Sequence, residues 1–200
     1  MDSLSVAMRV HTRSVTKGRR NPLHLGLPAR LKAAYKGSNL TQRQIGDAAG
    51  VSFTIIHYAS AGTTVPRIDT IERLAAALGV SPCWLAYGQH GARLFRQRMG
   101  PEDEMRQGVP APPPHPLACM GLGARLQLAR EMRHLTRKGL GRVAETSGTT
   151  ILSLEADRTM PGADLCEQIA HALKVSPCWL AYGDGQAPGP MPDDSEESAP

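Results

Sequence analysis

The sequence predicts an all-α protein in which one five-helix unit occurs twice, with a proline-rich linker between the two copies. The first reason is a repeat, because Ser81–Gly88 recurs unchanged as Ser176–Gly183. The similarity extends back without a gap to Leu40 and Leu135, and about half of the aligned positions are identical. The second reason is that apolar residues in each copy recur at helical spacing, with capping and glycine signals between the apolar segments. We therefore expect two small helical cores that arose by duplication.

Composition divides the chain into five segments. The N-terminal segment is rich in Arg and Lys without apolar periodicity, the segment between the repeats ends in a run of prolines, and the C-terminal segment is rich in proline and acid. Such sequences do not bury enough apolar surface to fold. The predicted organisation is a disordered basic arm (1–26), a first domain (27–88), a linker (89–121), a divergent second domain (122–183) and a disordered acidic tail (184–200).

In the first copy, apolar residues on one face predict a helix from Leu27 to a break around Gly37. Thr41 and Gln44 then fit a capping box, in which the Thr41 side chain accepts from the Gln44 amide and the Gln44 side chain reaches back. A second helix follows. It is closed by Gly50, which is able to adopt a positive φ.

The remaining helices follow from the same signals. Ser52 caps a third helix, predicted from Phe53 to about Ala61. A fourth helix is predicted over about 68–78, where apolar residues again share one face. Ser81 and Pro82 supply a cap and a first-turn proline for a short fifth helix. Because Gly50 ends the second helix and Ser52 begins the third, the first copy is predicted to have a tight turn between these two helices.

The spacing of these residues forms a specific pattern. It reads Leu40-Thr-Gln-x-x-Ile45-Gly-x-Ala-Ala-Gly-Val-Ser52-x-x-x-Ile56, followed by Gly62, Pro66 and Leu78-Gly-Val-Ser81. The pattern resembles the Cro/CI-type (XRE) helix-turn-helix regulators of phages and bacteria. The resemblance covers about 27–88 and, more weakly, 122–183. It implies two tandem five-helix Cro/CI-like (lambda-repressor-like) helix-turn-helix domains.

In this family the third helix enters the DNA major groove while the start of the second helix braces the backbone. The resemblance therefore implies that the base-facing residues of the first copy are Phe53, Thr54, His57 and Tyr58. It places Gln42 and Ser52 at phosphates, with Arg43 as a nearby cation. Two alternatives stay open, namely that Phe53 packs against the second helix and that His57 is an idle solvent-exposed residue.

The second copy departs from the pattern. Glu145 stands where the turn of the first copy has Gly50, and a glutamate in a left-handed conformation costs on the order of 1 kcal/mol. Glu155 keeps the acid that the family usually has near the end of the third helix, where the first copy has Ser60. By resemblance, the DNA-binding candidates of this copy are Arg137, Lys138, Ser147, Thr149 and Ser153. Its alternative roles are a clamp on the DNA backbone and an interaction module.

Two helix-turn-helix units in one chain can bind two DNA half-sites at the same time. Half-sites of helix-turn-helix proteins lie about 34 Å apart on one DNA face, and a flexible linker of this length spans on the order of 30 Å. Tethering raises the effective concentration of the second unit to about the millimolar scale. Because the third helices of the two copies differ, we expect two unlike half-sites.

Charge and cysteine content restrict the class of protein. The 23 Lys and Arg against 18 Asp and Glu give a net charge of +5, which favours a polyanionic partner such as DNA, RNA or an anionic membrane over a non-binding surface. No segment has the length of a membrane span or the core of a secretion signal, so we expect a cytoplasmic protein. The cysteines lack metal-ligand spacing, and we interpret them as small buried hydrophobes in a reducing compartment. They are Cys83, Cys119, Cys166 and Cys178.

These observations predict a sequence-specific transcriptional regulator, in particular a repressor, whose partner is double-stranded DNA. They leave open whether the chain also forms a homodimer or binds another protein. Motifs for phosphate binding, metal binding or a nucleophile are not found, so we expect neither an enzyme nor a cofactor. The alternative function is an antitoxin-like or protein-interaction module with weak or non-specific DNA binding. A further hypothesis is that the acidic tail folds over the basic face and inhibits DNA binding.

Overall fold

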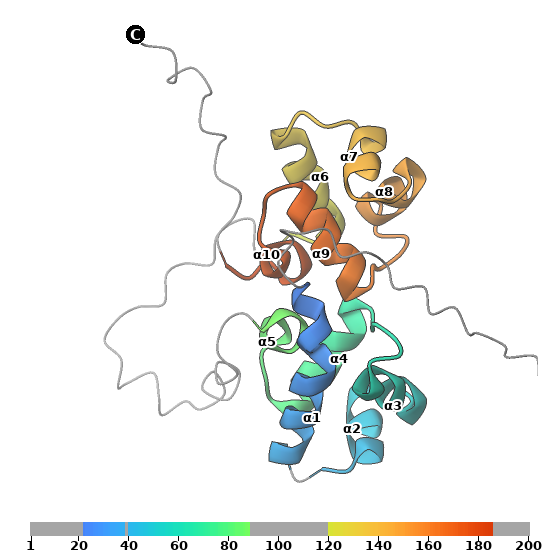
Figure 1. Cartoon of the computed structure of the whole chain (residues 1–200), viewed down its shortest axis with the longest axis vertical. Coiled ribbons are helices and arrows are strands. Elements are labelled where there is room, and N and C mark those ends of the chain that lie inside the picture. Colours follow the sequence, from blue (N-terminus) through green and yellow to red (C-terminus); the bar gives the residue numbers. More distant parts are fainter. Residues whose placement is uncertain (1–21, 39, 89–119, 186–200) are drawn as a thin grey trace, which may run out of the picture.

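The computed structural model describes residues 22–38, 40–88 and 120–185, and the regular elements of these residues are helices. The first repeat contains a short 3-10 helix η1 (Leu23–Gly26), α1 (Leu27–Ser38), α2 (Gln42–Ala49), α3 (Phe53–Ala61), α4 (Ile68–Leu78) and α5 (Pro82–Tyr87). The second repeat contains α6 (Leu122–Met132), α7 (Arg137–Val143), α8 (Gly148–Glu155), α9 (Ala163–Ala172) and α10 (Pro177–Tyr182). Figure 1 shows the repeats as two stacked helical bundles. The predicted all-α fold with two five-helix units is confirmed, while the prolines of the predicted linker lie outside the described residues.

The ends of α2 follow from the residues that predicted them. Thr41 Oγ1 accepts a hydrogen bond from the Gln44 amide at 3.3 Å, and the Thr41 amide donates to Gln44 Oε1 at 2.9 Å. Gly50 closes the helix with φ of 61°. The capping box and the left-handed turn are therefore both confirmed, and together they fix where α2 begins and ends.

The second repeat makes the same left-handed turns without glycine. Glu145, Asp157 and Lys174 have φ values of 51° or 52°. The first repeat has glycine at each equivalent position. A non-glycine residue in this region costs on the order of 1 kcal/mol, so the second repeat keeps its fold with more strain in its backbone.

The buried apolar side chains of the two repeats form one continuous cluster, so the expectation of two separate small cores is wrong. Fully buried side chains of the first repeat include Leu31, Ile45, Ile56, Ile71 and Leu74. Those of the second repeat include Leu126, Leu140, Ile151, Leu154 and Ile169. Both sets come from several helices. In the first repeat α4 packs behind the helix pair α2–α3 and holds it in place, and in the second repeat α9 does the same for α7–α8.

One arginine in each repeat ties the first long helix to the last short one. Arg30 donates from Nε to the Leu85 carbonyl at 3.0 Å and from Nη2 to the Ala86 carbonyl at 2.6 Å. Arg125 makes the same two bonds in the second repeat, to the carbonyls of Leu180 and Ala181 at 3.0 Å and 2.8 Å. These carbonyls belong to helix ends, where intrahelical donors are lacking. The arginines therefore fix α5 and α10, which build the contact between the repeats.

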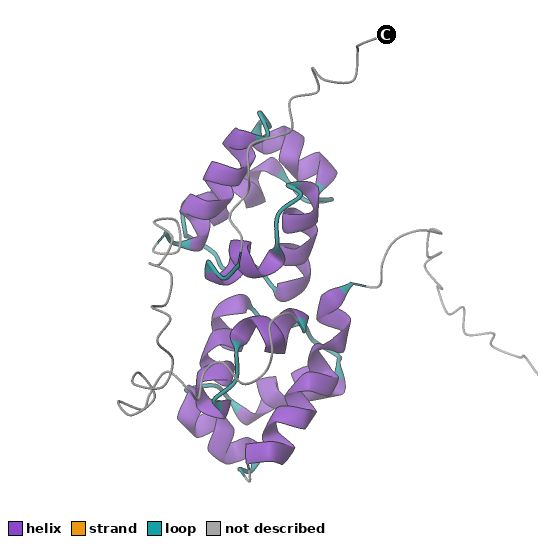
Figure 2. Cartoon of the chain, turned by 90° about the vertical axis from the view of Figure 1, so that its left-hand side faces the viewer, coloured by secondary structure: helices purple, strands orange, loops and turns teal. Residues whose placement is uncertain are grey.

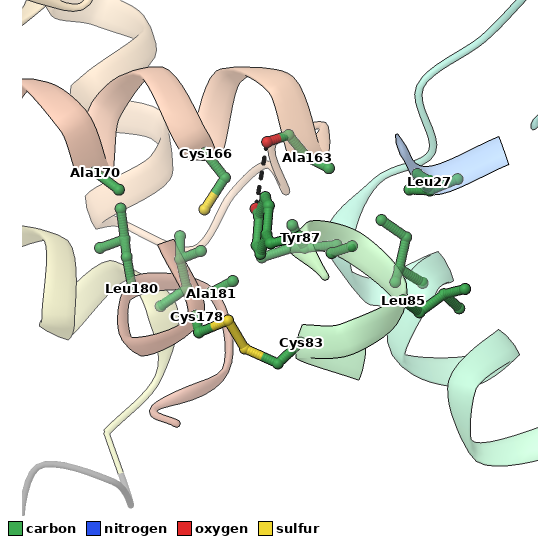
Figure 3. Packing of buried hydrophobic residues seen from close by; sticks show 14 of the residues in the cluster. Leu27, Cys83, Leu85, Tyr87, Ala163, Cys166, Ala170, Cys178, Leu180 and Ala181 are labelled. Atoms are coloured by element: carbon green, nitrogen blue, oxygen red, sulfur yellow. Dashed lines mark hydrogen bonds between the residues drawn. A yellow bond between two sulfur atoms is a disulfide. The ribbon is translucent and has the colours of Figure 1, made fainter. Parts of the chain in front are cut away.

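The two repeats pack directly on each other (Figures 1 and 2). The contact involves η1 and α5 of the first repeat and α9 and α10 of the second. The Tyr87 hydroxyl donates across it to the Ala163 carbonyl at 3.2 Å (Figure 3). The expectation of two units related only by a flexible tether is therefore wrong, because their separation is set by a packed interface.

A disulfide joins Cys83 and Cys178 across this interface, with Cα atoms 5.4 Å apart (Figure 3). Both residues are buried, as predicted, but they are bonded to each other, so their interpretation as separate thiols is wrong. They occupy equivalent positions next to the contact, so that packing of the repeats brings their side chains together. Cys166 is a buried free thiol, as predicted, and burial raises its pKa to about 12. Cys119 lies outside the described residues.

The start of the folded body differs from the predicted boundary. The amides of Leu23 and His24 donate to the Glu167 carboxylate at 2.6 Å and 3.1 Å, and His24 Nδ1 lies 2.7 Å from Glu167 Oε2. Residues 22–26 were assigned to the disordered arm, and that assignment is wrong because this carboxylate of the second repeat holds η1. Residues 1–21 of the predicted arm lie outside the described part of the chain.

Candidate nucleic-acid interface

The third helices of both repeats, α3 and α8, lie on the same side of the molecule, to the right in Figure 1. The second helix of each repeat, α2 or α7, packs beside its third helix. The short left-handed turn between them sets the angle at which the third helix leaves. The result is two helix-turn-helix units that face one way.

A glycine in each repeat lets its second and third helices approach closely. A Cβ atom on Gly46 would lie 2.6 Å from the Val51 carbonyl oxygen, and one on Gly141 would lie 2.9 Å from the Gly148 amide nitrogen. These separations are shorter than van der Waals contact, so a larger residue would push the third helix outward. This role was not predicted for either glycine, although their identity at equivalent positions was a usable signal.

The predicted base-facing residues of the first repeat lie on the exposed part of α3. Phe53 is 50% exposed and Tyr58 is 48% exposed, and Thr54 and His57 are also exposed. The His57 ring stacks on Phe53 with centroids 5.8 Å apart and meets Tyr58 edge-on at 5.7 Å. Phe53, His57 and Tyr58 thus form one exposed aromatic cluster. In it, His57 contacts both neighbouring rings, and Phe53 is half buried.

A groove lies between α2 and α3, beside the aromatic cluster. Its lining consists of Arg43, Asp47, Val51, Ser52 and Phe53. Arg43 and Ser52 are exposed, and the Ser52 hydroxyl makes no capping hydrogen bond to α3. A guanidinium and a hydroxyl are therefore available to an anion there. Asp47, which was not predicted as a site residue, brings a negative charge to the same groove, and Gln42 lies half-buried at the start of α2.

The hydroxyl groups of the second repeat are arranged differently. The Ser147 hydroxyl caps α8 by accepting from the Thr150 amide at 2.9 Å, and Thr149 Oγ1 lies 2.7 Å from it. Ser147 is thus engaged within the turn, unlike Ser52. Thr149 is exposed, whereas Ser153 is only partly exposed. This face is built from small polar groups and lacks aromatic rings.

Glu155, at the end of α8, holds one arginine at the start of α7 and another in α6. Arg137 Nε donates to Glu155 Oε2 at 2.6 Å, and Arg130 Nε donates to Oε1 at 2.5 Å. The Glu155 side chain is 3% exposed and that of Arg137 is 46% exposed. One edge of the Arg137 guanidinium is therefore fixed, while the rest is accessible to an anion. Lys138 is exposed next to it.

The described residues place no group of His, Cys, Asp or Glu side chains where it could hold a metal ion. Within the same ranges, each helix is too short or too polar to cross a membrane. The shared face offers hydroxyl, guanidinium, ammonium and aromatic groups, together with the carboxylate of Asp47.

Comparison with known proteins identifies the family. A helix-turn-helix family model matches the chain twice, at residues 31–85 and 126–180, which is more than half of the sequence. The chain is 44% identical over 75 residues to the HTH-type transcriptional regulator PrtR of Pseudomonas aeruginosa, a match that covers 38% of this chain and only 28% of that regulator. It is similar to the P22 c2 repressor solved in complex with a synthetic operator, at 26% identity and a TM-score of 0.32, over 32% of this chain and 98% of that one. The chain belongs to the Cro/CI-type helix-turn-helix family and carries the domain of that family twice.

Proposed function

We propose that the chain is a sequence-specific transcriptional regulator that binds double-stranded DNA and acts as a repressor. The observation that carries this proposal is the exposure of α3 and α8 on one side of two family-type helix-turn-helix units. Over its matched residues the chain is similar to a transcriptional regulator. A protein that fills adjacent stretches of major groove excludes other proteins from the same DNA, which accounts for repression. Such regulators act on DNA in the cytoplasm, where we place this chain.

In the proposed complex, the exposed part of α3 reads base edges. The Thr54 hydroxyl can donate to or accept from a base, and the half-exposed Phe53 ring can contact a thymine methyl group. His57 and Tyr58 offer polar groups on the same surface. Because the His57 ring contacts the rings of both Phe53 and Tyr58, the cluster is partly ordered before DNA binds.

The start of each second helix supplies the phosphate contacts. Gln42, Arg43 and Ser52 would flank the groove of the first repeat, and Arg137 and Lys138 would serve the second. Phosphate contacts fix the position of a protein on DNA without reading sequence. In the second repeat, base contacts would come from Thr149 and Ser153, and Ser147, at the position of Ser52, would lie at a phosphate.

Selection of bound duplexes from a random DNA pool, by full-length protein at about 0.1 M salt, tests the proposal. An enriched sequence is expected, and folded protein that enriches none would overturn it. On the enriched site, Thr54→Val should weaken binding by about 1–3 kcal/mol and relax one base position. Arg43→Gln should weaken binding to all sequences alike and reduce the slope of log affinity against log salt by about 1. Thr64→Val, on an exposed threonine beyond the end of α3, is the matched control and should change neither quantity.

One observation favours a second function, that of an antitoxin-like or protein-interaction module. Phe53, Ile55 and Tyr58 are 50%, 42% and 48% exposed, which is a large apolar surface for one short helix. If a protein partner binds there, the substitution Tyr58→Ser should abolish its binding, whereas Arg43→Gln should leave its binding unchanged. DNA binding as the main function predicts that both substitutions weaken complex formation with the selected duplex.

A further inference from the structure

The backbone hydrogen bonds between the repeats are reciprocal. The Ile68 amide donates to the Pro161 carbonyl at 3.1 Å, and the Ala163 amide donates to the Pro66 carbonyl, also at 3.1 Å. Ile68 and Ala163 occupy equivalent positions in the two repeats, and so do Pro66 and Pro161. The bond from Ile68 to Pro161 is therefore repeated, with the roles of the two repeats exchanged, by the bond from Ala163 to Pro66. Reciprocal contacts of this kind define a two-fold axis.

Two further contacts join equivalent residues directly. Arg67 pairs with Gly162 in an antiparallel bridge, and Cys83 is bonded to Cys178. A residue meets its own counterpart only where it lies close to the axis. The axis therefore passes between the loops that precede α4 and α9, and between α5 and α10. The repeats are related by rotation and not by translation along the chain, which is the other way to arrange a tandem pair.

This rotation determines how the helix-turn-helix units meet DNA. The two strands of a duplex are related by dyads perpendicular to its axis, so a protein with a two-fold axis places its recognition helices on half-sites of opposite orientation. Here α3 and α8 are exposed on one side (Figure 1). Units related by translation would instead need half-sites that read in the same direction.

The two recognition surfaces are not the same. The α3 surface carries the aromatic cluster of Phe53, His57 and Tyr58, whereas α8 carries Thr149 and the half-exposed Leu152 at 44%. Aromatic rings and small hydroxyls do not fit the same base edges. The two-fold relation therefore holds for the backbone and the interface but not for the reading surfaces.

Building on the proposed function, we propose that a single chain occupies a complete operator made of two unlike half-sites in inverted orientation, at a spacing fixed by the interface between the repeats. The surface that a separate copy of the domain would use for such pairing is already filled within the chain. In this proposal the linker only connects the two repeats covalently and does not determine the spacing. One chain therefore replaces two subunits.

The experiment uses full-length protein and four duplexes derived from the selected site. They are the selected duplex, one with the second half-site reversed, one with about 5 extra base pairs between the half-sites, and one with the second half-site scrambled. Reversal should lower affinity to the level of the scrambled duplex, a loss of about a hundredfold or more, because bivalent binding is lost. The extra half turn should do the same by moving one half-site to the other DNA face. Native mass spectrometry of the selected complex should show one chain per duplex.

Other results separate the possible failures. Equal affinity for the inverted and reversed duplexes, or two chains per duplex, would overturn the inference while leaving the proposed function intact. Absence of any selected sequence would overturn the proposed function itself. A variant with about ten Gly and Ser residues inserted after Gly108 should keep the same spacing preference, and a broadened preference would show that the linker controls spacing.

Discussion

Arg137 Nε donates to Glu155 Oε2 at 2.6 Å, which ties the start of α7 to the end of α8. Gln42 and Ser60 stand at these positions in the first repeat. Ser60 Oγ is buried there without a hydrogen-bond partner among the described residues. The second repeat thus holds its helix-turn-helix unit with a buried ion pair that the first repeat lacks, whereas in the first repeat Arg73 Nη1 donates to the Gly50 carbonyl of the turn at 3.2 Å.

Removing the charge of Glu155 should destabilise the second repeat. Glu155→Gln leaves Arg130, whose side chain is 10% exposed, without its buried counter-ion, and we expect a loss of about 3 kcal/mol. The measurement is urea unfolding followed by Trp179 fluorescence in a Trp84→Phe background, which leaves one tryptophan. Glu131→Gln is the control, because Glu131 is 55% exposed and bonds the same arginine at 3.3 Å. Equal effects of the two substitutions would contradict the prediction.

Two buried serines of the first repeat should respond to alanine with opposite signs. Ser60→Ala removes a hydroxyl that has no hydrogen-bond partner in the described part of the chain and should stabilise the fold by about 1 kcal/mol. Ser81→Ala removes the cap of α5, where the hydroxyl accepts from the Trp84 amide at 3.3 Å, and should destabilise by about 1 kcal/mol. Urea unfolding of both variants checks the pair, and a loss of stability in Ser60→Ala would show that this hydroxyl has a partner in solution.

The bond between Cys83 and Cys178 closes a long loop, since the residues are 95 apart in sequence. Breaking it should lower the free energy of unfolding by about 4 kcal/mol, because the unfolded chain gains freedom. Wild-type protein should therefore unfold at lower urea concentration with a phosphine reductant, whereas Cys83→Ser should not respond to the reductant. Counting thiols in unfolded, unreduced protein gives an independent check. Two reactive thiols are expected of the four cysteines, and four would refute the bond.

The contact of Glu167 with η1 should depend on pH. Burial acts to raise the pKa of this carboxyl group, but the hydrogen bonds from the His24 side chain and from the amides of Leu23 and His24 outweigh burial and hold the pKa below its ordinary value of 4.5. A lowered pKa in the folded state stabilises the protein fully above pH 4.5, and this stabilisation is lost as the pH falls through the folded value. Between about pH 5 and pH 3, wild type should lose more stability than Glu167→Gln. Glu72→Gln, at the equivalent exposed position of the first repeat, should instead follow wild type.

The helices could be predicted closely from the sequence because their ends are set by local chemistry. The Thr41–Gln44 capping box and the left-handed Gly50 are interactions over a few residues, and both were predicted and found. Glu145 could likewise be placed in a left-handed turn by its equivalence to Gly50. Local signals of this kind do not depend on how the repeats pack.

The contact between the repeats could not be predicted in this way. Cys83 and Cys178 lie near a two-fold axis that exists only once both units have folded, and no local pattern marks it. The role of Glu167 toward η1 is hidden for the same reason. A useful signal was nonetheless present, because identical residues at equivalent positions of a repeat are candidates for meeting each other across such an axis.

The two-fold interface within one chain also changes how the protein responds to dilution. Two separate subunits fall apart as their concentration drops, so that the amount of paired species falls with the square of the total. Here the pairing of the repeats is an intramolecular event, and its extent is the same at any expression level. The amount of the paired form therefore rises in simple proportion to synthesis, without a threshold. Even a few newly made molecules already have both third helices on one face.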